Sequence, residues 1–311
     1  GLVEYNDRYD EFAKFLNDHG YLVYCNDHLG HGLHVKKGEL KGYFADENGY
    51  EAVVDQLAEM NSVIRKAHPS LNHFFIGHSL GAALGLSFLK RNISFDAVIL
   101  SAPFTNHDFI LFLFGILVWP EYKFQGRRAI SMEMEKHTSL KHNSFFKPNR
   151  TPHDYLSRDH CRVDSYVEDE LCGFPKTTQM WLDLKSGFIG LWAKKSYKEI
   201  DPETRVLVVT GDKDPINNNG KQAERMHNSF VTGRLTAAGL LGQQRNKTTL
   251  LIVQHQIAVR RPLPQGRITM TIQPCPTATT QPAPQQPVGE NVVGRRGGTH
   301  GPTLRLPTAK C

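Results

Sequence analysis

The sequence lacks any pairing pattern among its cysteines and any apolar run long enough to cross a membrane. Its five cysteines are odd in number and widely scattered, at Cys25, Cys161, Cys172, Cys275 and Cys311. We therefore expect free thiols in a reducing compartment, and no disulfide framework or metal knuckle. The most apolar stretch, residues 109–119, has about half the length of a membrane-spanning helix. These absences predict a cytoplasmic protein, at most peripheral to membranes.

Aromatic and acidic residues are nearly missing from the C-terminal quarter. Residues 231–311 contain no Phe, Tyr or Trp, and they have ten Lys or Arg against one acid, Glu290. The net charge of +6 arises there, whereas residues 1–230, with 27 basic and 30 acidic residues, carry −3. That balance does not suggest a nucleic-acid partner. Because residues 231–311 can bury little apolar area, we expect an atypical, largely disordered tail in which only 247–259 could form a strand.

Apolar strands and amphipathic helices alternate through the rest of the chain. We expect strands at 21–26, 73–76, 97–101 and 205–210, and helices at 7–19, 50–67, 80–92 and 220–230. This alternation predicts the α/β class, with a mainly parallel sheet covered by helices on both faces. The alternation stops at Phe104 and resumes near Arg205. We therefore assign 1–103 and 179–230 to the core, and 104–178 to a helical cap inserted into it.

The segment 74–83 combines a strand, a sharp turn and a helix around one serine. Gly77-His78-Ser79-Leu80-Gly81 has the pattern G-x-S-x-G. In this context the pattern predicts a nucleophile elbow, in which small residues allow a tight turn that exposes the serine hydroxyl above the sheet. The alternative is a glycine-rich turn with a serine of no function.

Several segments, taken in order, resemble the monoacylglycerol lipase and lysophospholipase family of α/β hydrolases, also called serine aminopeptidase-like hydrolases. Gly1-Leu2-Val3-Glu4 with Arg8-Tyr9 resembles the oxyanion segment of that family without its leading histidine. Residues 27–32 resemble its D-x-x-G-H-G loop, residues 156–174 its cap run, and residues 211–215 the loop of its catalytic acid. The resemblance implies an α/β-hydrolase fold and covers residues 1 to about 230.

The sequence departs from that family at both ends. The family has strands before the oxyanion segment, and after the helix at 220–230 it has a strand and a histidine segment. Neither feature is found here. We therefore expect the chain to be N- and C-terminally incomplete relative to the family, with an altered C-terminal sequence.

Serine ester hydrolysis needs a nucleophile, a base oriented by a carboxylate, and donors for the oxyanion. The family match implies Ser79 as nucleophile and Asp214 as the acid, with Asp212 as the alternative. It also implies the backbone N–H groups of Leu2 and Leu80 as oxyanion donors.

The base is the gap in the predicted site. His78 adjoins Ser79, but neighbouring side chains of an elbow point apart, and His227 comes too early in the chain order. His255 is the remaining candidate, although its surroundings do not match the family segment. The alternative is that this chain has no catalytic histidine.

Three further histidines, His28, His31 and His34, have a spacing that could suggest metal ligands. Gly30 and Gly32 interrupt the helix that such a site would need, so we expect no metal and no cofactor. We expect Gly30-His31-Gly32 to shape the loop beside the oxyanion segment.

The resemblance implies a serine hydrolase of small lipid esters, either monoacylglycerol or lysophospholipid, acting through an acyl-enzyme and impaired if the histidine is lost. An aminopeptidase-like hydrolase and a non-catalytic binding protein are the alternatives. The apolar residues 109–119 would suit an acyl chain or a transient membrane-surface contact, or they could be buried between cap and core.

Overall fold

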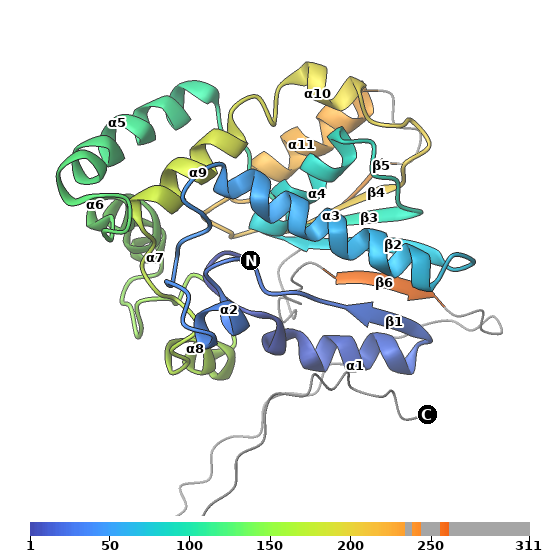
Figure 1. Ribbon diagram of the computed structural model, residues 1–311, viewed down its shortest axis with the longest axis horizontal. Helices are drawn as coiled ribbons and strands as arrows, with labels where there is room; N and C mark the ends of the chain where they lie inside the picture. The colour runs from blue at the N-terminus through green and yellow to red at the C-terminus, as the bar shows by residue number, and fades with distance from the viewer. Residues whose placement is uncertain (234–237, 244–255, 261–311) are drawn as a thin grey trace, which may run out of the picture. The chain divides into compact units, whose positions relative to one another are not determined.

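The computed structural model describes residues 1–233, 238–243 and 256–260. Within these residues six strands form one sheet in the order β1-β6-β2-β3-β4-β5 (Figure 1). The strands are β1 (Tyr21–Tyr24), β2 (Asn72–His78), β3 (Ala97–Ser101), β4 (Val206–Gly211), β5 (Ala238–Gln243) and β6 (Gln256–Arg260). Strands β2 to β5 are parallel, whereas β6 is antiparallel to both β1 and β2. The predicted α/β class with a mainly parallel sheet is confirmed.

The sheet continues past residue 230, where we expected the core to end. Strand β5 pairs with β4, and β6 lies between β1 and β2, so two strands come from the segment that we assigned to the tail. The composition of residues 231–311, averaged over the whole segment, hid β5, whereas β6 overlaps the stretch 247–259 that we expected could form a strand. The rest of the stretch 247–259, and the disorder expected from about Arg260, lie outside the described residues.

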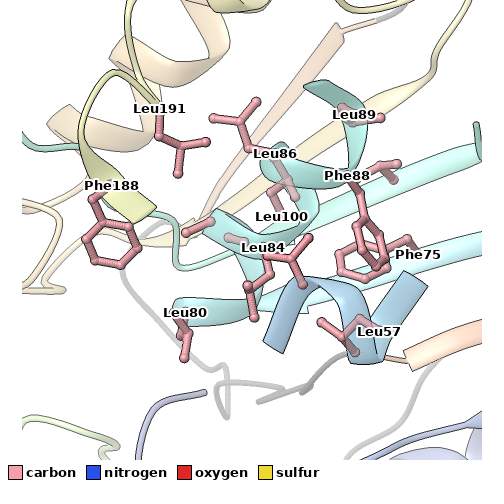
Figure 2. Packing of buried hydrophobic residues seen from close by; sticks show 14 of the residues in the cluster. Leu57, Phe75, Leu80, Leu84, Leu86, Phe88, Leu89, Leu100, Phe188 and Leu191 are labelled. Carbon is pink, nitrogen blue, oxygen red and sulfur yellow. The ribbon is translucent and has the colours of Figure 1, made fainter. Parts of the chain in front are cut away.

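Alternate side chains of the strands supply the cores on the two faces of the sheet. On β2, Phe75 joins the main cluster, whereas the next residue, Ile76, packs with Tyr9 and with α1 on the other face. Figure 2 shows Phe75 and Leu100 beside Leu84 of α4 in the main cluster. The core helices are η1 (Asn6–Tyr9), α1 (Asp10–Asp18), α2 (Gly32–Lys36), α3 (Gly49–Ala67), α4 (Leu80–Lys90), α9 (Thr178–Phe188), α10 (Lys194–Lys198) and α11 (Lys221–Thr232).

Residues 104–178 consist of helices joined by loops and gather at one side of the sheet (Figure 1). They form α5 (Asp108–Gln125), α6 (Met132–Glu135), η2 (Lys136–Leu140), α7 (Lys141–Asn143), η3 (Ser144–Phe146) and α8 (His160–Val167). All of this segment is described, and none of it pairs with the sheet; its one β-bridge joins Ile130 to Thr177. This is the segment that we assigned to a cap.

Helix α5 has one buried side and one exposed side. It contacts α9 and buries Leu111, Gly115 and Val118. Its other side leaves large apolar residues in contact with solvent, with Phe109 70%, Phe112 56%, Ile116 53% and Trp119 57% exposed. Among the described residues, no helix has both the length and the apolar character that crossing a membrane requires.

Candidate active site

Ser79 occupies the turn between β2 and α4, as predicted. Its backbone has φ 53° and ψ −112°, a left-handed conformation that residues other than glycine rarely adopt. A Cβ atom at Gly77 would lie 2.2 Å from the carbonyl oxygen of Gly81, so the turn admits only glycine at position 77. The serine side chain is partly exposed. The strand–turn–helix geometry of an elbow is therefore present.

Leu80 is the first residue of α4. A backbone N–H at that position has no acceptor within the helix, and it lies at the positive end of the helix dipole. Such a group suits the stabilisation of a developing negative charge.

The oxyanion segment is held next to the elbow by its third residue. Val3 is buried, adopts φ 55°, and donates its N–H to His31 Nε2 at 3.2 Å. Because Nε2 accepts this bond, Nδ1 carries the proton and donates to the Leu29 carbonyl at 2.8 Å. Burial lowers the pKa of His31 to about 4, which keeps the ring neutral near pH 7. His31 thus joins the Gly30-His31-Gly32 turn to the N-terminal segment at Val3.

Asp27, the first residue of the same loop, ties two segments together. Its buried carboxylate accepts from the N–H of Asn6 and from the N–H of Leu33, both at 2.8 Å. Gly32 is required here, because a Cβ atom would lie 2.3 Å from that carboxylate. The D-x-x-G-H-G loop therefore fixes the position of the N-terminal segment through hydrogen bonds.

His31 and His34 both form hydrogen bonds with other groups of the protein. His34 Nδ1 lies 3.0 Å from Glu39 Oε1, and its Nε2 lies 3.1 Å from the Gln56 amide. The described part of the chain holds no group of three His, Cys, Asp or Glu side chains placed to bind a metal ion.

Asp214 follows β4 and is held by the loop that it begins. Its carboxylate accepts from the Ile216 N–H at 2.9 Å and from the Asn217 amide at 3.1 Å. Burial raises the pKa of Asp214, while hydrogen bonds from these two residues oppose the rise. The alternative acid, Asp212, pairs instead with Arg158 of the cap segment at 3.3 Å. The geometry favours Asp214, which the loop already orients.

No histidine takes the predicted place of the base in the described residues. His78 Nδ1 lies 3.2 Å from Ser101 Oγ, and burial lowers its pKa to about 4, as for a packed neutral ring. His227 lies on α11 near Asn228, and His255 lies outside the described residues. Sequence reasoning missed three histidines of the segment 104–178 that line the cavities around Ser79, namely His137, His142 and His160.

Two cavities meet at Ser79. The larger, about 550 Å³, is lined by Ser79, Asp214 and many polar or charged side chains, among them Arg8, Arg150, Asp154, Arg158 and His160. The smaller, about 350 Å³, runs under the cap and is lined mainly by apolar side chains, among them Phe104, Leu111, Phe114, Val118 and Trp181. Leu2 and Ser79 line both cavities. The serine therefore stands between two cavities that differ in their residues: the first, called the polar cavity, has charged side chains of both signs in its wall, and the second, called the apolar cavity, has more apolar side chains together with three lysines, Lys141, Lys176 and Lys185.

Comparison with known proteins agrees with this geometry. The chain is 29% identical to the monoglyceride lipase of Rattus norvegicus over 176 residues, which are 55% of this chain and 50% of that protein. It is 26% identical to the monoacylglycerol lipase of Mycolicibacterium smegmatis over 218 residues, or 70% of this chain and 68% of that protein. The chain thus spans about half the length of the rat relative.

Solved structures share the fold. A thermostable carboxyl esterase from Bacillus coagulans superposes with a TM-score of 0.70 at 18% identity, over 78% of each chain. The monoacylglycerol lipase of Paleococcus ferrophilus gives 0.54 at 20% identity, over 78% of this chain and 81% of that one. A sequence model of the family described as serine aminopeptidase, S33 (Hydrolase_4), matches residues 1–234. The chain therefore belongs to the serine aminopeptidase S33 family of α/β hydrolases.

Proposed function

We propose that this protein is a serine hydrolase of small lipid esters, such as a monoacylglycerol or a lysophospholipid. The observation that carries the proposal is the position of Ser79 at the border of the two cavities. A lipid ester has an apolar acyl chain and a polar alcohol on either side of its carbonyl carbon. The apolar cavity would take the acyl chain and the polar cavity the alcohol.

In the proposed reaction, Ser79 Oγ attacks the ester carbonyl carbon as a base removes its proton. The oxyanion is stabilised by the N–H groups of Leu80 and Leu2, and the alcohol leaves to give an acyl-enzyme. Water then releases the acid by the same steps. Asp214 orients and stabilises the base, in the order along the chain that this fold uses.

We further propose that turnover by this chain is weak. The histidine segment typical of the family does not follow α11 in the sequence, and His255 is a poor match for it. The acid acts only through a histidine, so a triad without one behaves as a broken unit. A non-catalytic protein that binds an acyl ligand in the apolar cavity is the second candidate, favoured by the same observation.

Labelling with a fluorophosphonate probe and monoacylglycerol turnover test these proposals. We expect the probe to label Ser79 slowly, in keeping with weak turnover, and the label to vanish in Ser79→Ala, while Ser165→Ala, at an exposed serine of α8, keeps it. An unlabelled wild-type protein would favour the binding protein. Robust turnover that is lost in both Ser79→Ala and His255→Ala would contradict the proposed weakness and make His255 the base.

We also propose a transient contact between the exposed side of α5 and a membrane surface. Phe109, Phe112, Ile116 and Trp119 lie three or four residues apart, so they share one side of the helix. Other residues of the same helix, Leu111, Phe114 and Val118, line the apolar cavity. Such a contact would bring lipid substrates close to the cavity.

A further inference from the structure

The left-handed backbone of Val3 is an unusual feature of this site. Val3 is β-branched, adopts φ 55°, and is buried. A left-handed conformation is unfavourable for a β-branched L residue, so the surrounding structure must hold it in place. Position 3 separates Leu2, the proposed oxyanion donor, from the rest of the N-terminal segment.

Three hydrogen bonds hold the two peptide groups of Val3. Two of them come from the cap segment, one from α8 and one from the loop that follows α8. The N–H of Val3 is bound by His31. Its carbonyl oxygen accepts from the Gly173 N–H at 2.9 Å and from the Tyr166 hydroxyl at 3.2 Å. Tyr166 belongs to α8 and is itself buried, and the bond spans 163 positions of the sequence.

The same part of the chain is anchored close by. The Tyr5 hydroxyl donates to Asp169 Oδ2 at 2.7 Å, and the Cys172 N–H donates to the Asp169 carbonyl at 2.9 Å. The stretch that includes Asp169 and Gly173 is thus tied to the N-terminal segment at two places, Val3 and Tyr5.

We propose that Tyr166 is a positioning residue, through which the cap sets the oxyanion hole. This inference rests on the proposed hydrolase function. Fixing both peptide groups of Val3 fixes its φ and ψ, and therefore the direction of the chain through Leu2. When the Tyr166 hydroxyl is removed, the Val3 carbonyl keeps one donor, and the Leu2 N–H is held less firmly at the place where the oxyanion forms.

The test compares Tyr166→Phe with Tyr50→Phe. The phenylalanine keeps the ring that packs 5.1 Å from His153 and 5.0 Å from the Arg8 guanidinium. Tyr50 is the matched control, because its buried hydroxyl lies 2.9 Å from Ser87 Oγ and forms no part of the Val3 contacts. Ester turnover and the Val3 amide resonance of protein labelled with ¹⁵N-valine are both measured. The resonance is assigned by its loss in Val3→Ala.

We expect Tyr166→Phe to lower kcat about tenfold with KM unchanged, since complete loss of an oxyanion donor costs about 100- to 1,000-fold. We also expect its Val3 amide to shift and to exchange with solvent faster, while Tyr50→Phe changes neither readout. An unmoved Val3 amide would overturn the inference, whatever happens to kcat. A moved amide with unchanged kcat would equally overturn it.

Failure of the proposed function is a separate outcome. If wild-type protein has no turnover that depends on Ser79, the hydrolase proposal fails, while the Val3 amide still reports whether Tyr166 positions this segment. Should Tyr166→Phe not fold, Tyr5→Phe removes the neighbouring bond to Asp169, and it is expected to move the same resonance in the same direction. An unmoved resonance in Tyr5→Phe would then overturn the inference.

Discussion

At the scale of single residues, the elbow depends on the absence of a Cβ atom at Gly77. A Cβ atom at Gly77 would meet the backbone oxygen and carbon of Gly81 at 2.2 and 2.5 Å, and backbone atoms cannot move aside as a flexible side chain can. At Gly211, at the end of β4, the nearest atom to such a Cβ is 3.9 Å away. Two glycines at comparable strand ends therefore differ in what they tolerate.

Gly77→Ala should lower the free energy of unfolding by about 2–3 kcal/mol, through overpacking against backbone. Gly211→Ala, the matched control, should stay within about 0.5 kcal/mol of wild type. Urea unfolding followed by circular dichroism measures both. Equal stabilities of the two variants would contradict the steric role of Gly77.

His31 makes the structure sensitive to acid. Its Nε2 must accept from the Val3 N–H, so the folded protein holds the neutral ring, and burial lowers its pKa to about 4. The unfolded chain binds that proton near pH 6.5. The contribution of His31 to stability is therefore full above pH 6.5 and is lost as the pH falls toward 4.

We expect His31→Asn to lose less stability than wild type between pH 7 and pH 4, by up to about 3 kcal/mol. Denaturant unfolding at a series of pH values measures the difference. His19→Asn is the control, since His19 lies at the half-exposed end of α1. Parallel pH profiles of His31→Asn and wild type would show that His31 does not set this dependence.

At the scale of elements, α5 is apolar on both of its sides, although only one is buried. The sequence of residues 109–119 did not indicate which side of the helix faces α9, because periodicity cannot orient a helix that is apolar all round. The structure resolves this by placing Gly115 against Lys185 of α9.

Phe112→Asp should weaken binding of the protein to phosphatidylcholine vesicles by about tenfold or more, because it removes apolar area and adds a charge on the exposed side of α5. Val63→Asp is the control, since Val63 of α3 is 61% exposed and stands outside this group. Vesicle flotation gives the bound fraction. Equal losses in the two variants would argue against α5 as the contact surface.

A buried ion pair fixes the end of the cap segment. Lys176 Nζ lies 2.7 Å from Glu135 Oε1 of α6, and both side chains are largely buried. Burial lowers the pKa of Lys176, and the attraction of Glu135 opposes that change. Removing one partner leaves the other charge uncompensated in the interior.

Glu135→Leu should therefore cost about 3–5 kcal/mol of stability. The double variant Glu135→Leu with Lys176→Met should recover most of that loss, because it replaces the pair by apolar groups of similar size. A double-mutant cycle in urea measures the recovery. A double variant no more stable than the single one would refute this account.

At the scale of the whole molecule, the sequence alone predicted the core strands β2, β3 and β4, the turn at Ser79 and the place of Asp214 after β4. These features depend on short-range signals such as apolar runs, glycines and turn residues. The hydrogen bond from the Tyr166 hydroxyl to the Val3 carbonyl could not be predicted, because it joins residues 163 positions apart without any local pattern. Strand β5 was missed because its apolar stretch is short within a polar segment, whereas β6 overlaps the stretch 247–259 that we named as a possible strand.

The border between the two cavities at Ser79 bears on how the two products would leave. In the proposed reaction, departure of the alcohol would empty the polar cavity while the acyl group would still occupy the apolar one. The next molecule to enter beside the acyl-serine therefore comes through the polar cavity, where water competes with any small alcohol in solution. The ratio of free acid to new ester formed in added glycerol would then follow the shape and charge of that cavity, and would be independent of the acyl chain.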